Sequence, residues 1–161
     1  MLFSLSPRQI LAAAMLAAAI VAGGCANQQA AIEAGMGAAT PGSPQEFTVS
    51  VGDRVFFETD SSSLTAQAQA TLDRQAQWLT KYAQYSFTVE GHADERGTRE
   101  YNLALGARRA SAVRDFLISR GVAASRMRTV SYGKERPVAV CDDISCWSQN
   151  RRAVTVLDGA G

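Results

Sequence analysis

Charge is distributed unevenly along this chain. Of its 16 basic and 15 acidic residues, only Arg8 and Glu33 come before Glu46. Arg8 precedes an unbroken apolar run, residues 10–22, which would be about 20 Å long as a helix. A membrane-spanning helix has to cross roughly 30 Å of hydrocarbon, so this run is too short for one. A positive start, a short apolar run and small residues after it are typical of an export signal.

The apolar run ends in the letters AGGC, of which the last is Cys25. This segment resembles the lipobox of bacterial lipoproteins, although leucine is usual where Ala22 stands. We therefore predict a lipoprotein signal peptide over residues 1–24 and lipidation at Cys25. Ala26 stands where an aspartate would retain a lipoprotein in the inner membrane, which implies the outer membrane. The alternative is an ordinary signal peptide with an incidental cysteine.

Two regions of different composition follow the signal. Residues 25–45 are rich in Ala, Gly, Gln and Pro and are predicted to form a flexible tether that begins at the lipidated cysteine. Residues 46–161 hold nearly all the charge and are predicted to form one globular domain. The net charge of the whole chain is only +1. It therefore lacks the basic excess typical of proteins that bind nucleic acid, and we expect no such partner.

Strand and helix patterns alternate within the predicted domain. Residues 85–90 alternate apolar and polar side chains, as a half-buried strand does. The order of the patterns is β–α–β–α–β–β, which predicts an α+β sandwich, a small mixed sheet with two helices packed on one face. The predicted strands are residues 47–51, 54–58, 85–90, 128–132 and 152–157, and the predicted helices are residues 65–82 and 99–120.

Each predicted helix has an apolar face and a signal at one end. Residues 61–63, three serines, are expected to cap the start of the first helix, and Gly121 is placed to end the second. The side chains expected to face the core are Ala68, Leu72, Ala76 and Leu79 in the first helix, and Tyr101, Leu105, Ala112, Phe116 and Leu117 in the second.

Two cysteines remain besides the predicted lipid site. Cys141 and Cys146 lie close together in the loop before the last strand. Export would bring them to an oxidising compartment, so we predict a disulfide, worth roughly 2 kcal/mol for so short a loop. A metal site is the alternative, but two thiols without a nearby histidine make a poor one.

The sequence holds no motif of an activated nucleophile or a phosphate-binding loop. His92 is the only histidine, and Asp94 lies two residues after it. A catalytic metal needs further ligands than these two, so we expect no metal and no other cofactor. The lack of such motifs therefore favours a binding protein over an enzyme.

Asp94 follows a predicted strand, and Arg108 and Arg109 lie midway along the next helix. If that helix runs back over the sheet, one guanidinium comes near the end of the strand. A carboxylate and a guanidinium held apart by a small ligand would match an ammonium and a carboxylate on one carbon. On spacing alone, an internal Asp–Arg salt bridge is the competing interpretation.

Four segments resemble the signature of the OmpA-like peptidoglycan-binding domain. They are residues 89–98 (VEGHADERGT), 100–110 (EYNLALGARRA), 131–137 (SYGKERP) and 150–154 (NRRAV). The resemblance extends in order over about residues 55–157. It implies non-covalent binding of the meso-diaminopimelate peptide stem of peptidoglycan, with no metal and no enzymatic step.

The resemblance also implies which residues form the site. Asp94 and Arg109 match the pair that binds diaminopimelate, and Asn102 matches an asparagine of the family's helix. The loop that contains Cys141 and Cys146 departs from the family pattern. The implied peptidoglycan-binding residues are Asp94, Arg109, Asn102, Phe57, Asp60, Asn150 and Arg151.

Together with the lipobox, the resemblance implies an outer-membrane lipoprotein of the Tol–Pal system whose domain faces the periplasm. The expected partners are peptidoglycan, TolB and TolA. The implied role is to draw the outer membrane inward at cell division and to keep the envelope intact. Two alternatives stay open: a lipid-anchored periplasmic enzyme that acts on cell-wall fragments, and a structural wall-binding lipoprotein outside the Tol–Pal system.

Overall fold

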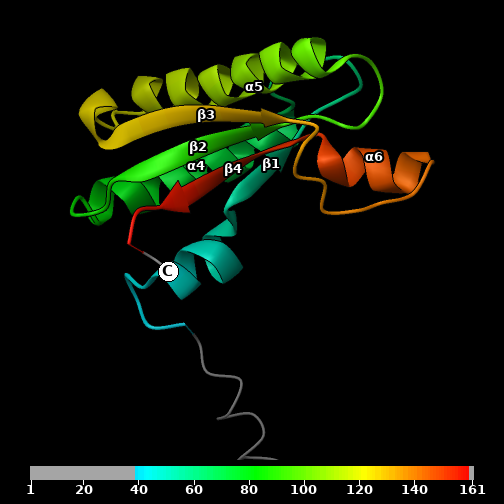
Figure 1. Ribbon diagram of the computed structural model, residues 1–161. Coiled ribbons are helices and arrows are strands. Elements are labelled where there is room, and N and C mark those ends of the chain that lie inside the picture. Colours follow the sequence, from blue (N-terminus) through cyan, green and yellow to red (C-terminus); the bar gives the residue numbers. More distant parts are fainter. Residues whose placement is uncertain (1–38, 160–161) are drawn as a thin grey trace, which may run out of the picture. The chain divides into compact units, whose positions relative to one another are not determined.

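The computed structural model describes residues 39–159, which belong to one compact unit (Figure 1). The predicted signal peptide, the lipid site Cys25 and most of the predicted tether lie outside the described residues. The end of the predicted tether, from Ala39 onward, lies in the compact unit. No helix among the described residues is long and apolar enough to span a membrane.

The elements follow the predicted order, with additions at the start and before the last strand. They are α3 (Pro44–Glu46), the π-helix η1 (Phe47–Gly52), β1 (Arg54–Phe56), α4 (Ala66–Lys81), β2 (Phe87–His92), α5 (Arg99–Ser119), the 3₁₀-helix η2 (Ala124–Arg126), β3 (Met127–Gly133), α6 (Ile144–Asn150) and β4 (Arg152–Leu157).

The four strands form one mixed sheet in the order β1-β4-β2-β3, in which only β2 and β3 are parallel. Val89 of β2 lies opposite Thr155 of β4, so the two side chains share a face. The Thr155 hydroxyl donates to Gln75 of α4, and Gly91 on the same face of β2 lies against Gly106 of α5. Both long helices therefore cover one face, which confirms the predicted α+β architecture.

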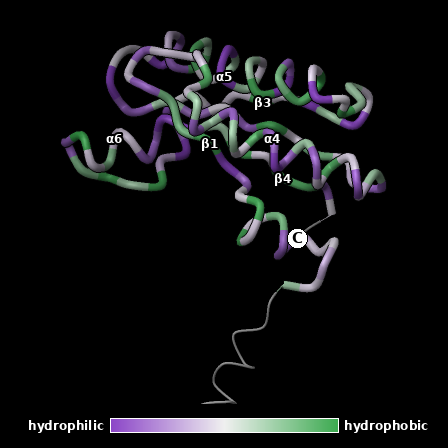
Figure 2. Tube along the Cα trace, turned by 180° about the vertical axis from the view of Figure 1, so that it is seen from behind, coloured by the Kyte–Doolittle hydropathy of each residue, from purple (hydrophilic) through white to green (hydrophobic). Residues whose placement is uncertain are grey.

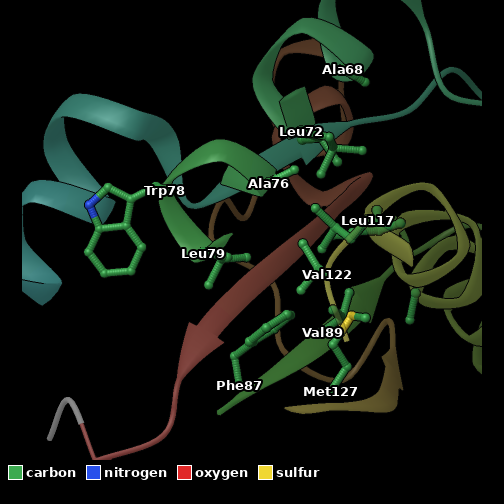
Figure 3. Packing of buried hydrophobic residues seen from close by; sticks show 14 of the residues in the cluster. Ala68, Leu72, Ala76, Trp78, Leu79, Phe87, Val89, Leu117, Val122 and Met127 are labelled. Atoms are coloured by element: carbon green, nitrogen blue, oxygen red, sulfur yellow. The ribbon is translucent and has the colours of Figure 1, made fainter. Parts of the chain in front are cut away.

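The hydrophobic core lies between this face and the two helices. Leu72 and Leu79 of α4 and Leu117 of α5 point toward Phe87 and Val89 of β2 (Figure 3). These five side chains are fully buried. Burial of each contributes about 1.5–3 kcal/mol. All four side chains predicted to line the inner face of α4 are buried, as their helical spacing indicates.

The buried face of helix α5 agrees with the predicted one only in part. Leu105 and Leu117 are buried, but Tyr101 is 44% exposed and the polar Asn102 and Arg109 face inward instead. Hydrophilic and hydrophobic segments alternate along this helix (Figure 2). The reason is that the first half of α5 lies over a polar site and only its second half lies over the apolar core.

The strand predicted over residues 47–51 is wrong, because the chain there is helical. The Ser43 side chain caps the preceding turn, in which Pro44 takes the first position, where a proline fits best. The Glu46 carboxylate accepts from the Trp78 indole at 2.7 Å, and the Phe47 ring lies 4.9 Å from that indole ring. These contacts bury Phe47 although no strand pairs with this segment. They outweigh the alternation of apolar and polar side chains that predicts a strand here.

The helix ends differ from the prediction at one position. The cap of α4 is Thr65, whose side chain accepts from the Ala68 N–H, and the serines at 61–63 do not cap it. Gly121 ends α5 as predicted, with φ of +91° and its N–H donated to Ile118 O. The predicted strands that correspond to β1, β2, β3 and β4 are confirmed within two residues at each end.

Helix α6 was predicted as loop. It lies beyond the carboxyl ends of β2 and β3 (Figure 1), is capped by the Asp143 carboxylate and begins beside the predicted disulfide. The disulfide between Cys141 and Cys146 is present, with the two Cα atoms 5.6 Å apart, and confirms that prediction. The cross-link and the cap stabilise a helix of seven residues, which would be marginal by itself.

Contact between two glycines sets the distance of α5 from the sheet. A Cβ atom on Gly91 would lie 1.8 Å from the Gly106 carbonyl oxygen, and one on Gly106 would lie 2.8 Å from the Gly91 carbonyl oxygen. Neither neighbour is the end of a flexible side chain. The backbones of β2 and α5 therefore touch directly, which fixes where the first half of α5 lies.

We predict that Gly91→Ala lowers the free energy of unfolding by about 3 kcal/mol or more, because backbone must move to admit the methyl group. Gly121→Ala is the control, since nothing lies within 4 Å of the added Cβ and only its positive φ is strained. It should cost about 1–2 kcal/mol. Urea denaturation measures both, and equal losses would contradict the direct contact of backbones.

Candidate functional site

The candidate site is formed around a turn that connects β2 to α5. Its backbone is held at several points: Ala93 N–H donates to Gly133 O, the Lys134 ammonium donates to Glu95 O and Gly97 O, and Asn102 donates to Arg96 O at 2.7 Å. The Thr98 hydroxyl then caps α5. These bonds fix the turn that carries Asp94.

Asp94 is 7% exposed and is paired with two arginines. Arg96 donates to both carboxylate oxygens, from Nε to Oδ1 at 3.1 Å and from Nη2 to Oδ2 at 2.6 Å. Nη1 of Arg151 lies 3.5 Å from Oδ2. Burial raises the pKa of Asp94, but the hydrogen bonds and charge of Arg96, with Arg151, lower it more. The net pKa lies below the ordinary value, so the carboxylate is charged at neutral pH.

Arg109 of α5 is fully buried under the same region. Its guanidinium donates to three backbone carbonyls, those of Ser61 at 2.8 Å, His92 at 2.8 Å and Glu58 at 3.1 Å. The guanidinium carbon lies 5.1 Å from the centroid of the Phe57 ring. Burial lowers the pKa of Arg109 to about 10, against the opposing effect of the Asp94 charge, and the group stays charged at neutral pH.

A pocket of about 250 Å³ opens beside Asp94. It lies between the loop after β1, the turn after β2 and the first turns of α5. Asp60 stands at its rim in the left-handed region, with φ of 55°, and accepts from the Tyr101 hydroxyl. The pocket is lined by Thr59, Asp60, Asp94, Arg96, Gly97, Tyr101, Asn102 and Leu105.

The structure brings together most of the residues that the sequence predicts. Asp60, Asp94 and Asn102 line the pocket, while Phe57 and Arg109 are buried nearby and do not line it. By contrast, Arg108, next to the buried arginine, is exposed. A step of one residue on a helix turns a side chain by about 100°, which explains the difference.

The two remaining predicted residues act from the end of α6. Arg151 donates from Nε to Phe57 O and also contacts Asp94, so it belongs to the surroundings of the site. Asn150 does not reach the pocket. Its side chain accepts from the N–H groups of Val138 and Ala139 and donates to Ala139 O, which holds the loop before α6.

Sequence reasoning missed Arg96 and Trp147. The only signal for Arg96 is its place two residues after Asp94. The Arg96 guanidinium carbon lies 4.2 Å from the centroid of the Trp147 ring, and the indole donates to the Glu95 carboxylate. Trp147 could not be found because α6 was not predicted. Among the described residues, no three His, Cys, Asp or Glu side chains lie together as metal ligands would.

The part of the chain that forms this fold and pocket is similar to known proteins. A family model described as the OmpA family matches residues 56–151, which contain every predicted site residue of the domain. The chain therefore belongs to the OmpA family, as its motifs predict.

Its relatives include proteins named peptidoglycan-associated lipoprotein. That of Rhizobium meliloti is 76% identical over 135 residues, which are 84% of this chain and 77% of the relative. That of Mesorhizobium japonicum is 68% identical over 97% of this chain and 94% of the relative. The crystal structure of the peptidoglycan-associated lipoprotein from Burkholderia pseudomallei is 45% identical, with a TM-score of 0.68 over 72% of this chain and all of that one.

His92 makes the free energy of unfolding of the domain depend on pH. Burial, together with the positive charges of Arg152 and Arg136, lowers the pKa of His92 from 6.5 to about 4. Between these values the unfolded chain binds a proton that the folded chain does not. The free energy of unfolding therefore falls as the pH decreases from 6.5 to 4, by about 3 kcal/mol in all.

We predict that His92→Gln removes most of this slope, because no other side chain of the chain has an ordinary pKa near 6.5. Urea denaturation between pH 7 and pH 4 checks it. The carboxylates, which titrate lower, supply the dependence that remains. A variant that keeps the full slope above pH 5 would contradict the assignment to His92.

Proposed function

We propose that the domain binds the diaminopimelate-containing peptide stem of peptidoglycan, non-covalently, in the pocket beside Asp94. The observation that carries this proposal is the charge arrangement of the pocket. Two carboxylates, those of Asp60 and Asp94, and the guanidinium of Arg96 line it, and the buried Arg109 lies close enough for both carboxylates to act on its charge. One end of meso-diaminopimelate has an ammonium and a carboxylate on the same carbon, which complement these charges.

In this proposal Asp94 accepts from the ammonium group and Arg109 pairs with the carboxylate. Because Arg109 is fully buried, the pocket has to open before a ligand reaches it. Asn102 and Arg151 support Asp94 through the contacts already described, and Asn150 acts only by holding the loop before α6. Phe57 supports the Arg109 guanidinium, and Asp60 faces the ligand from the opposite rim.

A binding role is favoured over a catalytic one by the side chains present. The described residues that line the pocket include no histidine and no cysteine, which are the usual bases and nucleophiles of hydrolytic enzymes. The relatives bear the name peptidoglycan-associated lipoprotein, which agrees with attachment to the cell wall.

The same name supports a lipid anchor, which the lipobox assigns to Cys25. We propose that this anchor lies in the outer membrane and that the domain faces the periplasm. A membrane anchor at one end and a wall-binding domain at the other would connect the two layers of the envelope. We include in the proposal membership of the Tol–Pal system, with TolB and TolA as protein partners and a role in cell division.

Asp94→Ala should weaken binding to purified peptidoglycan stem peptide by roughly thirtyfold or more. Loss of one partner from a charged pair in a partly desolvated site costs about 2–5 kcal/mol, and each 1.4 kcal/mol is tenfold in affinity. Arg109→Lys should weaken binding similarly, because lysine keeps the charge but lacks the paired donors of a guanidinium. Equilibrium binding by calorimetry measures both.

Arg108→Ala is the matched control, since that side chain is exposed beside Arg109 and touches the pocket only through the outer Tyr101 ring, 5.9 Å away, and it should weaken binding much less. Melting temperatures have to be measured in parallel, because Asp94 and Arg109 also hold the fold through the bonds described above. Folded Asp94→Ala and Arg109→Lys proteins that bind with wild-type affinity would show that these residues only hold the fold.

The anchor is tested separately. Cys25→Ser should abolish labelling with radioactive palmitate and leave the protein unprocessed or soluble in the periplasm, because serine has no thiol to carry the lipid. Palmitate incorporated into this variant at the wild-type level would contradict lipidation at Cys25. Cys141→Ser with Cys146→Ser serves as the control and should still be labelled.

A further inference from the structure

Arg96 occupies the Asp94 carboxylate in the structure of the free domain. Its guanidinium makes two hydrogen bonds to that carboxylate, and the two oxygens are the acceptors that a ligand ammonium would need. The Asp94 side chain is only 9% exposed. A ligand can therefore pair with Asp94 only if Arg96 releases it.

The Arg96 side chain can move without a change in the backbone. Its carbonyl is held by Asn102, and the carbonyls of Glu95 and Gly97 are held by Lys134. The side chain itself is 40% exposed. Side chains with this exposure change rotamer in picoseconds to nanoseconds, so release of Asp94 needs no unfolding of the turn.

In the position in which it pairs with Asp94, the Arg96 guanidinium also has an aromatic neighbour. It already contacts the Trp147 ring at 4.2 Å, and the Glu95 carboxylate accepts from the same indole. The disulfide between Cys141 and Cys146 crosslinks the start of α6, and Trp147 directly follows Cys146. The displaced Arg96 would therefore stay at the mouth of the pocket, on an aromatic surface held in place by α6.

We propose that Arg96 selects the ligand by admitting an ammonium group only when a carboxylate accompanies it. The proposal rests on the proposed function and adds a specificity residue to Asp94 and Arg109. A lone ammonium that takes Asp94 replaces one ion pair by another and leaves Arg96 with only the charge of the neighbouring Glu95, to which it donates no hydrogen bond. A zwitterionic end gives Arg96 a new partner as well, because the ligand carboxylate, which Arg109 binds through one oxygen, can pair with the displaced Arg96 guanidinium through the other.

Two tripeptides that differ by one carboxylate test this directly: L-Ala-γ-D-Glu-meso-diaminopimelate and the same peptide with L-lysine in the third position. Wild type should prefer the first. In Arg96→Gln, neither peptide competes with a guanidinium for Asp94. Only the diaminopimelate peptide loses an interaction, the ion pair between its carboxylate and Arg96. The ratio of the two dissociation constants should therefore fall by about tenfold, the effect of one charged hydrogen-bonded pair.

Arg99→Gln is the matched control. It removes the same charge three residues along, from an exposed side chain that pairs with Glu135 and does not line the pocket. Its ratio of dissociation constants should equal that of wild type. Arg96→Lys should lie between wild type and Arg96→Gln, because lysine can pair with only one oxygen at a time.

Nuclear magnetic resonance gives a second readout in the wild-type protein. The Nε–Hε signal of Arg96 should shift when the diaminopimelate tripeptide is added, because that group leaves Oδ1 of Asp94. A signal that stays in place while the peptide binds would show that Arg96 does not release Asp94, and the proposal would be wrong.

The outcomes separate this proposal from the proposed function. Wild type that binds the diaminopimelate tripeptide no better than Asp94→Ala would overturn both. Binding that depends on Asp94 but keeps the same ratio of dissociation constants in Arg96→Gln would leave the proposed function standing and overturn the role of Arg96. Equal weakening of both peptides in Arg96→Gln would also overturn it, since a merely supporting side chain has that effect.

Discussion

The buried guanidinium of Arg109 is the constraint on which the site depends. Removing a charge from water costs several kcal/mol unless its hydrogen bonds are replaced. Arg109 replaces them with carbonyls from the loop after β1, at Glu58 and Ser61, and from the end of β2, at His92. Two segments that are distant in sequence therefore have to meet around one position of helix α5, and the pocket lies between these segments and the helix.

The sheet divides into two ends of different character. Toward the start of β2, Phe87 and the leucines of α4 and α5 form an apolar core that supplies most of the stability. Toward the end of β2, three buried arginines, Arg109, Arg151 and Arg152, take the place of apolar side chains. Buried charges of this kind add little net stability, so their presence is explained by what they hold in position.

Helix α6 extends the charged end beyond the sheet. The disulfide fixes its first turn, Trp147 contacts Arg96, and Arg151 at its carboxyl end contacts Asp94. The two arginines that contact the Asp94 carboxylate, Arg96 and Arg151, are thus both supported by one short helix. The glycine contact between β2 and α5 complements it, because it brings the first turns of α5 close enough to close the pocket.

The sequence by itself determined those features that depend on residues near one another in the chain. Helical spacing and the alternation of residues located α4 and β4, and the neighbouring cysteines indicated their disulfide. The motifs identified the family. Tertiary structure decided the rest: residues 47–51 became helical because Trp78 and Glu46 hold them, and Asp94 paired with Arg96 and Arg151. Such pairings depend on which segments, distant in the sequence, come together around a buried charge. The pattern of neighbouring residues does not contain that information.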